Sequence, residues 1–151
     1  MVFHLMTEPI ETRLVNLSIG QRAEFTEVIS ESMIDEFAKL SGDYNSHHMD
    51  ESYARKTRFK KRICHGMLLA SLFSRLIGMH LPGKHSLYFS QSLNFLYPAF
   101  IDDKVTVEGE IVKISRSTGI ITLKTRITKE NNIELVTGEA KVVVLEPSLD
   151  N

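Results

Sequence analysis

Two side chains able to hold and move a proton lie five positions apart, Asp43 and His48. A carboxylate and an imidazole are suited to act as general base and general acid near neutral pH. Together they can hold one water molecule, take a proton from it and give a proton to a neighbouring atom. Asn45 lies between them and can hold the loop by bonding to the backbone. The pattern indicates acid–base chemistry on water, with Asp43 and His48 as the catalytic pair.

A second group of interest is the backbone N–H of Gly66, at the predicted start of a helix. Donors at a helix N-terminus stabilise negative charge that develops on a substrate oxygen. Glycine also lets a substrate approach the backbone closely. Gly66 is therefore the candidate oxyanion donor. Ser74 in the same helix is a candidate to support the site, unless its hydroxyl bonds back to its own helix.

Helices are predicted in the first half of the chain. Ser32, followed three residues later by Asp35, predicts a helix start, and Gly42 predicts its end. Residues 43–49 form a polar loop, and Asp50 can cap a short helix. Residues 66–80 form a helix that is apolar on nearly its whole circumference, which predicts burial on all sides.

Long alternating segments with short turns between them predict antiparallel strands. The fold class is therefore α+β, with a curved antiparallel sheet wrapped around the buried helix. Large apolar residues of the helix and strands are candidates to floor a substrate pocket. These residues are Phe73, Phe89, Leu93 and Phe95. The strands themselves are expected at residues 22–29, 86–96, 104–114, 118–128 and 133–145.

The composition suits one globular domain over residues 1–151, with a core from about 20 to 145. A net charge of −1 gives no general attraction to nucleic acid or to anionic membranes. The apolar stretch near residue 70 is too short and too polar to span a bilayer. Without a signal-like N-terminus, and with one cysteine, the chain is expected in the cytoplasm.

Cys64 is expected to be a small buried residue and not a nucleophile, because no third group is visible to orient it with His65. The six histidines show no metal-ligand spacing, so no metal site is expected. A run of six cations between the catalytic loop and Gly66 is either a solvated face or a contact for an anionic substrate carrier. The run comprises Arg55, Lys56, Arg58, Lys60, Lys61 and Arg62.

Three blocks of sequence, in order, resemble the MaoC-like dehydratases, and within them the (R)-specific enoyl-CoA hydratases. Residues 37–54 carry the pattern F-x-x-L-S-G-D-x-N-x-x-H-x5-A. Residues 64–74 read CHGMLLASLFS, and residues 81–84 and 90–95 read LPGK and SQSLNF. The chain departs from the family at Ser46 and His47, where proline and an aliphatic residue are usual.

The resemblance implies a hot-dog fold, a homodimer and a role in fatty acid metabolism. It implies reversible hydration of a trans-2-enoyl-CoA to the (R)-3-hydroxyacyl-CoA, with coenzyme A as part of the substrate and no separate cofactor. Asp43 and His48 match the catalytic pair, Gly66 the oxyanion position and Ser74 a serine near the site. A 3-hydroxyacyl-ACP dehydratase, which would bind acyl carrier protein, a thioesterase and a non-catalytic acyl-CoA sensor are the alternatives.

Overall fold

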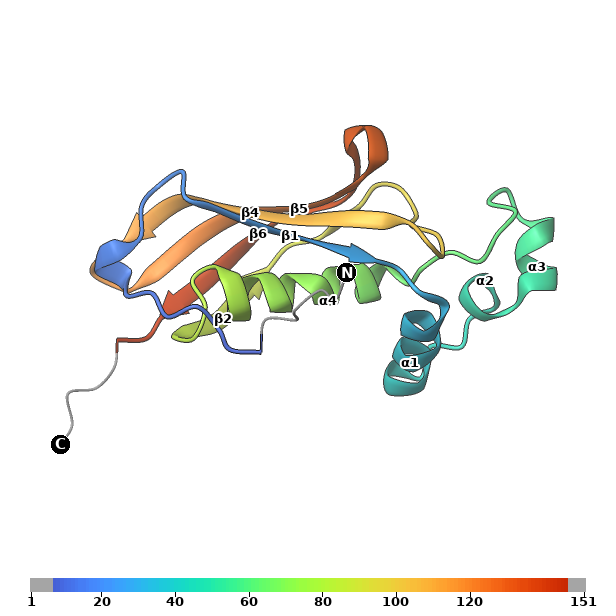
Figure 1. Ribbon diagram of the computed structural model, residues 1–151, viewed down its shortest axis with the longest axis horizontal. Coiled ribbons are helices and arrows are strands. Elements are labelled where there is room, and N and C mark those ends of the chain that lie inside the picture. Colours follow the sequence, from blue (N-terminus) through green and yellow to red (C-terminus); the bar gives the residue numbers. More distant parts are fainter. Residues whose placement is uncertain (1–6, 147–151) are drawn as a thin grey trace.

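One curved antiparallel sheet holds all the strands that the computed structural model describes, over residues 7–146 (Figure 1). The strand order is β1-β4-β5-β6-β2, and the short β3 pairs with β6. The ends of the domain predicted over residues 1–151 lie outside the described residues. The strands are β1 (Arg22–Val28), β2 (Ser86–Gln91), β3 (Asn94–Phe95), β4 (Lys104–Ser115), β5 (Ile120–Lys129) and β6 (Ile133–Val144).

Alternation along the long strands gives the sheet one apolar face. In β4, Val105, Val107 and Ile111 are fully buried, and the alternate residues, which face the opposite side of the sheet, are partly exposed. Gly109 falls on the same buried face, where an added Cβ would lie 2.9 Å from the side chain of Leu76. The sheet and the helical segment that contains Leu76 therefore approach each other closely at this point.

Three short helices hold the predicted catalytic loop. Helix α1 (Glu31–Ser41) is capped by Ser30, whose Oγ accepts from the Met33 N–H at 3.1 Å, so the prediction of Ser32 as the cap was wrong. Gly42 ends α1 with a φ of 79°, as predicted. The expected loop instead contains α2 (Ser46–Met49), and Asp50 caps α3 (Glu51–Lys56) as expected.

The central helix α4 (Gly66–Arg75) packs against the sheet and continues as a π-helical turn, η2 (Leu76–His80). Figure 1 shows α4 lying along one face of the sheet, with α1, α2 and α3 beyond its N-terminal end. This arrangement confirms the predicted hot-dog architecture. Short 3-10 turns, η1 (Leu14–Asn16) and η3 (Glu130–Asn132), complete the described elements.

Burial of α4 is one-sided, which corrects the expectation that it is covered all round. Leu69 and Phe73 are almost fully buried, whereas Met67 is 56% exposed and Ser71 and Ser74 are exposed. A single sheet covers only the side of a helix that faces it, so an apolar circumference leaves part of α4 uncovered in one chain. Across residues 7–146, no helix has the length and hydropathy needed to cross a membrane.

Candidate active site

The loop that follows α1 is held by a chain of local hydrogen bonds. The Asp43 N–H donates to Ser41 Oγ at 3.1 Å, and the Asn45 N–H donates to Asp43 Oδ1 at 3.1 Å. Asn45 Oδ1 in turn accepts from the His47 N–H at 3.0 Å, which starts α2. Asn45 thus supports the loop through the backbone, and one oxygen of Asp43, Oδ2, takes no part in this chain.

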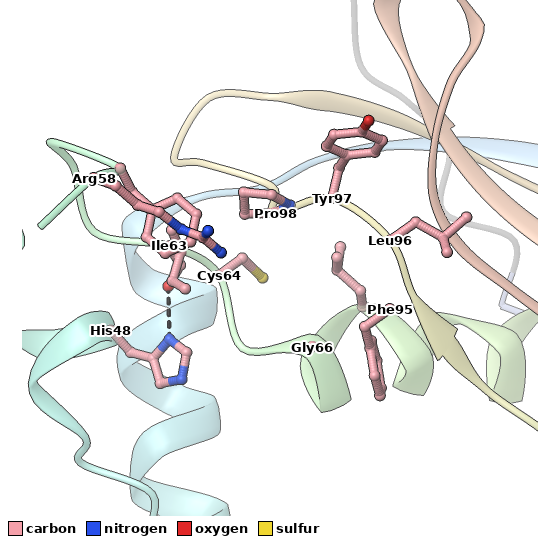
Figure 2. Close-up of a pocket in the computed structure, with 11 residues that line it drawn as sticks. His48, Arg58, Ile63, Cys64, Gly66, Phe95, Leu96, Tyr97 and Pro98 are labelled. Atoms are coloured by element: carbon pink, nitrogen blue, oxygen red, sulfur yellow. Dashed lines mark hydrogen bonds between the residues drawn. The ribbon is translucent and has the colours of Figure 1, made fainter.

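His48 is fixed with one ring nitrogen turned toward Asp43. Its Nδ1 lies 2.8 Å from the carbonyl oxygen of Ile63, drawn as the dashed line in Figure 2. A carbonyl only accepts, so Nδ1 carries the proton, and Nε2 of the neutral ring offers a lone pair. Nε2 and Asp43 Oδ2 are 3.9 Å apart. This distance exceeds a direct hydrogen bond and leaves room for a water molecule bonded to both atoms.

The surroundings of His48 favour its neutral form. Burial lowers the pKa of His48 below its ordinary value of 6.5, and the neighbouring His65 and His47 lower this pKa further. The hydrogen bond to Ile63 and the Asp43 carboxylate act in the opposite direction but do not reverse the shift. His48 is therefore neutral at pH 7, and its Nε2 lone pair can accept a hydrogen bond from water.

A third imidazole, His65, joins the pair. Its Nε2–H donates to the main-chain carbonyl of Asp43 at 3.0 Å, and its ring stacks on His48 with centroids 3.9 Å apart. The side chain is buried at 1% exposure. Sequence reasoning did not assign His65 to the site. Its position directly before Gly66, in the second family-like block, was the available signal.

Asp43, His48 and His65 each offer a metal-ligating atom, and these atoms lie within 4.8 Å of one another. The geometry does not suit an ion. A ring nitrogen binds along a lone pair that lies in the plane of its ring, with the metal about 2 Å away. The two imidazoles are stacked with planes only 29° apart, so their lone pairs do not converge on one point at that distance.

A cavity of about 450 Å³ adjoins this cluster, and His48 and Gly66 both line it. Gly66 is the first residue of α4, where backbone N–H groups have no acceptor within the helix. A Cβ at Gly66 would lie 2.8 Å from the Phe95 ring, which Figure 2 places beside the start of α4. The remaining walls are Arg58, Phe59, Ile63, Cys64, Leu69, Leu96, Tyr97 and Pro98.

Other residues considered from the sequence lie outside this cavity. Ser74 is exposed on α4 and is absent from the cavity wall. Of the four pocket-floor candidates, only Phe95 lines the cavity. Phe73 is buried in the core, Leu93 packs against the core, and Phe89 is 65% exposed on β2. The segment from Phe95 to Pro98 forms part of the cavity wall, and the alternation of the sequence did not predict this.

The cationic run divides into one structural residue and five exposed ones. Arg62 is 8% exposed, and its guanidinium donates to Glu31 at 2.8 Å, to Asp35 at 3.1 Å and to the His48 carbonyl. Arg62 therefore ties α1 to the catalytic loop and is unsuited to a carrier phosphate. Arg58 lies at the cavity, over the Phe59 ring at 4.8 Å. Arg55, Lys56, Lys60 and Lys61 are exposed nearby.

Cys64 forms part of the cavity wall as a neutral thiol. Burial raises its pKa to about 12, and Asp103 raises it in the same direction. A thiolate is the nucleophilic form of cysteine, so this residue is unreactive at neutral pH. The prediction that Cys64 is a small buried residue is confirmed.

Comparison with known proteins gives consistent likenesses. Residues 15–134 match the family described as MaoC like domain. The (R)-specific enoyl-CoA hydratase of Aeromonas caviae is 45% identical over 127 residues, covering 84% of this chain and 95% of the relative. A mitochondrial 3-hydroxyacyl-[acyl-carrier-protein] dehydratase of Arabidopsis thaliana is 35% identical over 136 residues, which cover 89% of this chain and 80% of the relative. The solved structure of the (R)-hydratase from A. caviae involved in PHA biosynthesis matches with a TM-score of 0.84 and 44% identity. The match covers 86% of this chain and 98% of that chain.

Proposed function

The chain belongs to the MaoC-like domain family, and from that premise we propose that it hydrates trans-2-enoyl-CoA reversibly to (R)-3-hydroxyacyl-CoA. The observation that carries the proposal is the pair of acceptor atoms, Asp43 Oδ2 and His48 Nε2, 3.9 Å apart beside an apolar cavity. This makes the protein a carbon–oxygen lyase. The (R) configuration rests on the names of its relatives.

The pair of acceptors activates water. An ionised carboxylate and the lone pair of a neutral imidazole both accept hydrogen bonds, so a water between them donates both of its hydrogens. Its oxygen lone pairs are then directed away from the pair, toward the β-carbon of the substrate. One acceptor takes a proton as the carbon–oxygen bond forms.

The backbone N–H of Gly66 stabilises the negative charge that develops during the reaction. As water attacks the β-carbon, negative charge develops on the thioester oxygen, and the N–H at the start of α4 stabilises it. The proton taken from water is then delivered to the α-carbon, so the product contains the elements of one water. No electron is gained or lost overall, and the reaction as proposed uses no cofactor, coenzyme A being part of the substrate.

Crotonyl-CoA provides the direct test. The purified protein should remove the absorbance of the conjugated enoyl thioester, and a coupled (R)-specific dehydrogenase should oxidise the product. A product accepted only by an (S)-specific dehydrogenase would contradict the stereochemistry. No loss of absorbance with crotonyl-CoA or a medium-chain homologue would contradict CoA-ester hydration altogether.

A 3-hydroxyacyl-ACP dehydratase is the second candidate, favoured by the Arabidopsis relative and by the exposed cations. Acyl carrier protein is acidic, and exposed Arg58 and its cationic neighbours would attract it. Turnover of crotonyl-ACP without turnover of crotonyl-CoA would favour this candidate. Release of free thiol from either ester would indicate a thioesterase, and tight binding without turnover would indicate an acyl-CoA sensor.

Arg58 is the exposed cation best placed to contact the coenzyme A phosphates. We expect Arg58→Gln to raise KM for crotonyl-CoA roughly three- to tenfold, because an exposed charge contact has modest strength. Steady-state kinetics with crotonyl-pantetheine, which lacks the nucleotide, should show no such change. The control Lys113→Gln removes an exposed charge from β4 and should leave both KM values unaltered. Equal effects of Arg58→Gln on both esters would argue against a phosphate contact.

The lowered pKa of His48 has a consequence for the pH profile. Protonation of His48 removes the lone pair that accepts from water, so kcat/KM should fall as the pH is lowered, with the midpoint of the fall below pH 6.5. His47→Gln removes a neighbour that lowers this pKa, so the fall should move to higher pH. Titration of the coenzyme A phosphate, near pH 6, would give a fall that the variant does not move.

A homodimer is part of the same proposal. Large exposed apolar side chains occur on α4, on the edge strand β2 and on the cavity wall, which is unusual for a monomer surface. Sedimentation equilibrium should give twice the chain mass of 17.2 kDa. The exposed apolar side chains are those of Met67, Leu87, Phe89, Phe95, Leu96 and Tyr97.

A single buried thiol suits the reducing cytoplasm, and the chemistry suits fatty acid metabolism.

A further inference from the structure

His65 connects the three groups that the proposed hydration requires. Its Nε2–H reaches back 22 positions to the carbonyl of Asp43, and its ring lies against the ring of His48. Its main chain forms the N-cap of α4, so the next residue is Gly66. One buried side chain therefore relates the carboxylate loop, the imidazole and the helix N-terminus to one another.

The choice of histidine at this buried position is not explained by packing. Nδ1 of His65 is buried and has no hydrogen-bond partner in the described part of the chain. A buried polar atom without a partner costs stability, and an apolar ring of similar shape would avoid that cost. What an apolar ring cannot supply is the Nε2–H donated to the Asp43 carbonyl.

We propose that His65 is a positioning residue for hydration: its bond to the Asp43 carbonyl and its stack on His48 set the spacing of the acid–base pair relative to Gly66. This inference rests on the proposed function. His65 acts through Asp43 and His48 and does not itself exchange protons with the substrate. Displacement of a catalytic group by about 1 Å can reduce a rate about 100-fold, so such a residue has a large effect on kcat.

Three substitutions separate the donated bond from the bulk of the side chain. The amide nitrogen of Gln is as many bonds from the backbone as Nε2 of His, so His65→Gln keeps the donor in reach of Asp43. His65→Asn keeps an amide but is one carbon shorter, and His65→Phe keeps a ring without a donor. His80→Phe is the matched control, since His80 also has a buried ring nitrogen with no partner among residues 7–146, at the opposite end of the helical segment.

We expect kcat with crotonyl-CoA to fall about 100-fold in His65→Phe and His65→Asn, and less than fivefold in His65→Gln, with KM nearly constant. His65→Phe should unfold thermally at a temperature close to that of wild type, because removal of the unpartnered Nδ1 offsets the loss of the hydrogen bond to the Asp43 carbonyl. His80→Phe should retain wild-type kcat. This combination of stable folding, lost turnover and rescue by Gln is not expected of a residue that only fills space.

Full kcat in His65→Phe, or a Gln variant no more active than the Asn variant, would overturn the positioning role while wild-type turnover upholds the proposed function. If the Phe variant does not fold, the Gln and Asn pair, which differ by one methylene, still decides. An inactive wild type, tested with both crotonyl-CoA and crotonyl-ACP, would overturn the proposed function and the role of His65 with it.

Discussion

Asp43→Asn should reduce kcat for crotonyl-CoA hydration by about 10³-fold or more, with the fold intact. The Asn side chain retains an oxygen that can accept the hydrogen bond from the Asn45 N–H, as Asp43 Oδ1 does in the wild type. It replaces Oδ2 with an NH₂ group, which donates hydrogen bonds and cannot take a proton from water. The Asp43 side chain is 48% exposed, so we expect the free energy of unfolding to change by only about 0.5 kcal/mol.

Initial rates and thermal unfolding of the same preparation would check this result. Asp50→Asn is the matched control, because it makes the same chemical change seven residues later, at the cap of α3. Asn caps helices about as well as Asp, so this variant should keep both its activity and its stability. If Asp43→Asn retained more than a tenth of wild-type kcat, Asp43 would not be the group that accepts the proton of water.

Features that depend on residues close together in the sequence could be predicted. Alternation in β4 and β5 follows from burial of one face of the sheet, and the strand bounds agree with expectation to within a few residues. Asp43 and His48 are close because a loop and the single turn of α2 connect them, so sequence spacing was informative about their distance. Gly66 was recognised because the start of a helix has a sequence signal.

Features that depend on contacts between residues distant in the sequence could not be predicted. Arg62 reads as one of six similar cations, yet Glu31 and Asp35 from α1 bury it, and no local pattern distinguishes it from Arg58. His65 joins the site through a carbonyl 22 residues earlier, which spacing does not reveal. The apolar surface of α4 was interpreted as burial on all sides within one chain, whereas Met67 on this helix is exposed.

The requirement for two acceptors makes His48 the second position at which substitution should have a large effect. His48→Asn should lower kcat about 10²- to 10⁴-fold. The amide nitrogen of Asn lies about where Nδ1 lies in His, so the variant can still donate to the Ile63 carbonyl and hold the loop. It has no atom at the position of Nε2, which faces Asp43 Oδ2 across 3.9 Å.

Combining the two substitutions tests whether they act on one water. Removal of either acceptor leaves that water unable to donate both hydrogens, so Asp43→Asn/His48→Asn should be little slower than the slower single variant. Steady-state kcat values of the four proteins form a complete double-mutant cycle. If the two losses multiplied, the side chains would act in separate steps, and a water shared across 3.9 Å would no longer describe this site.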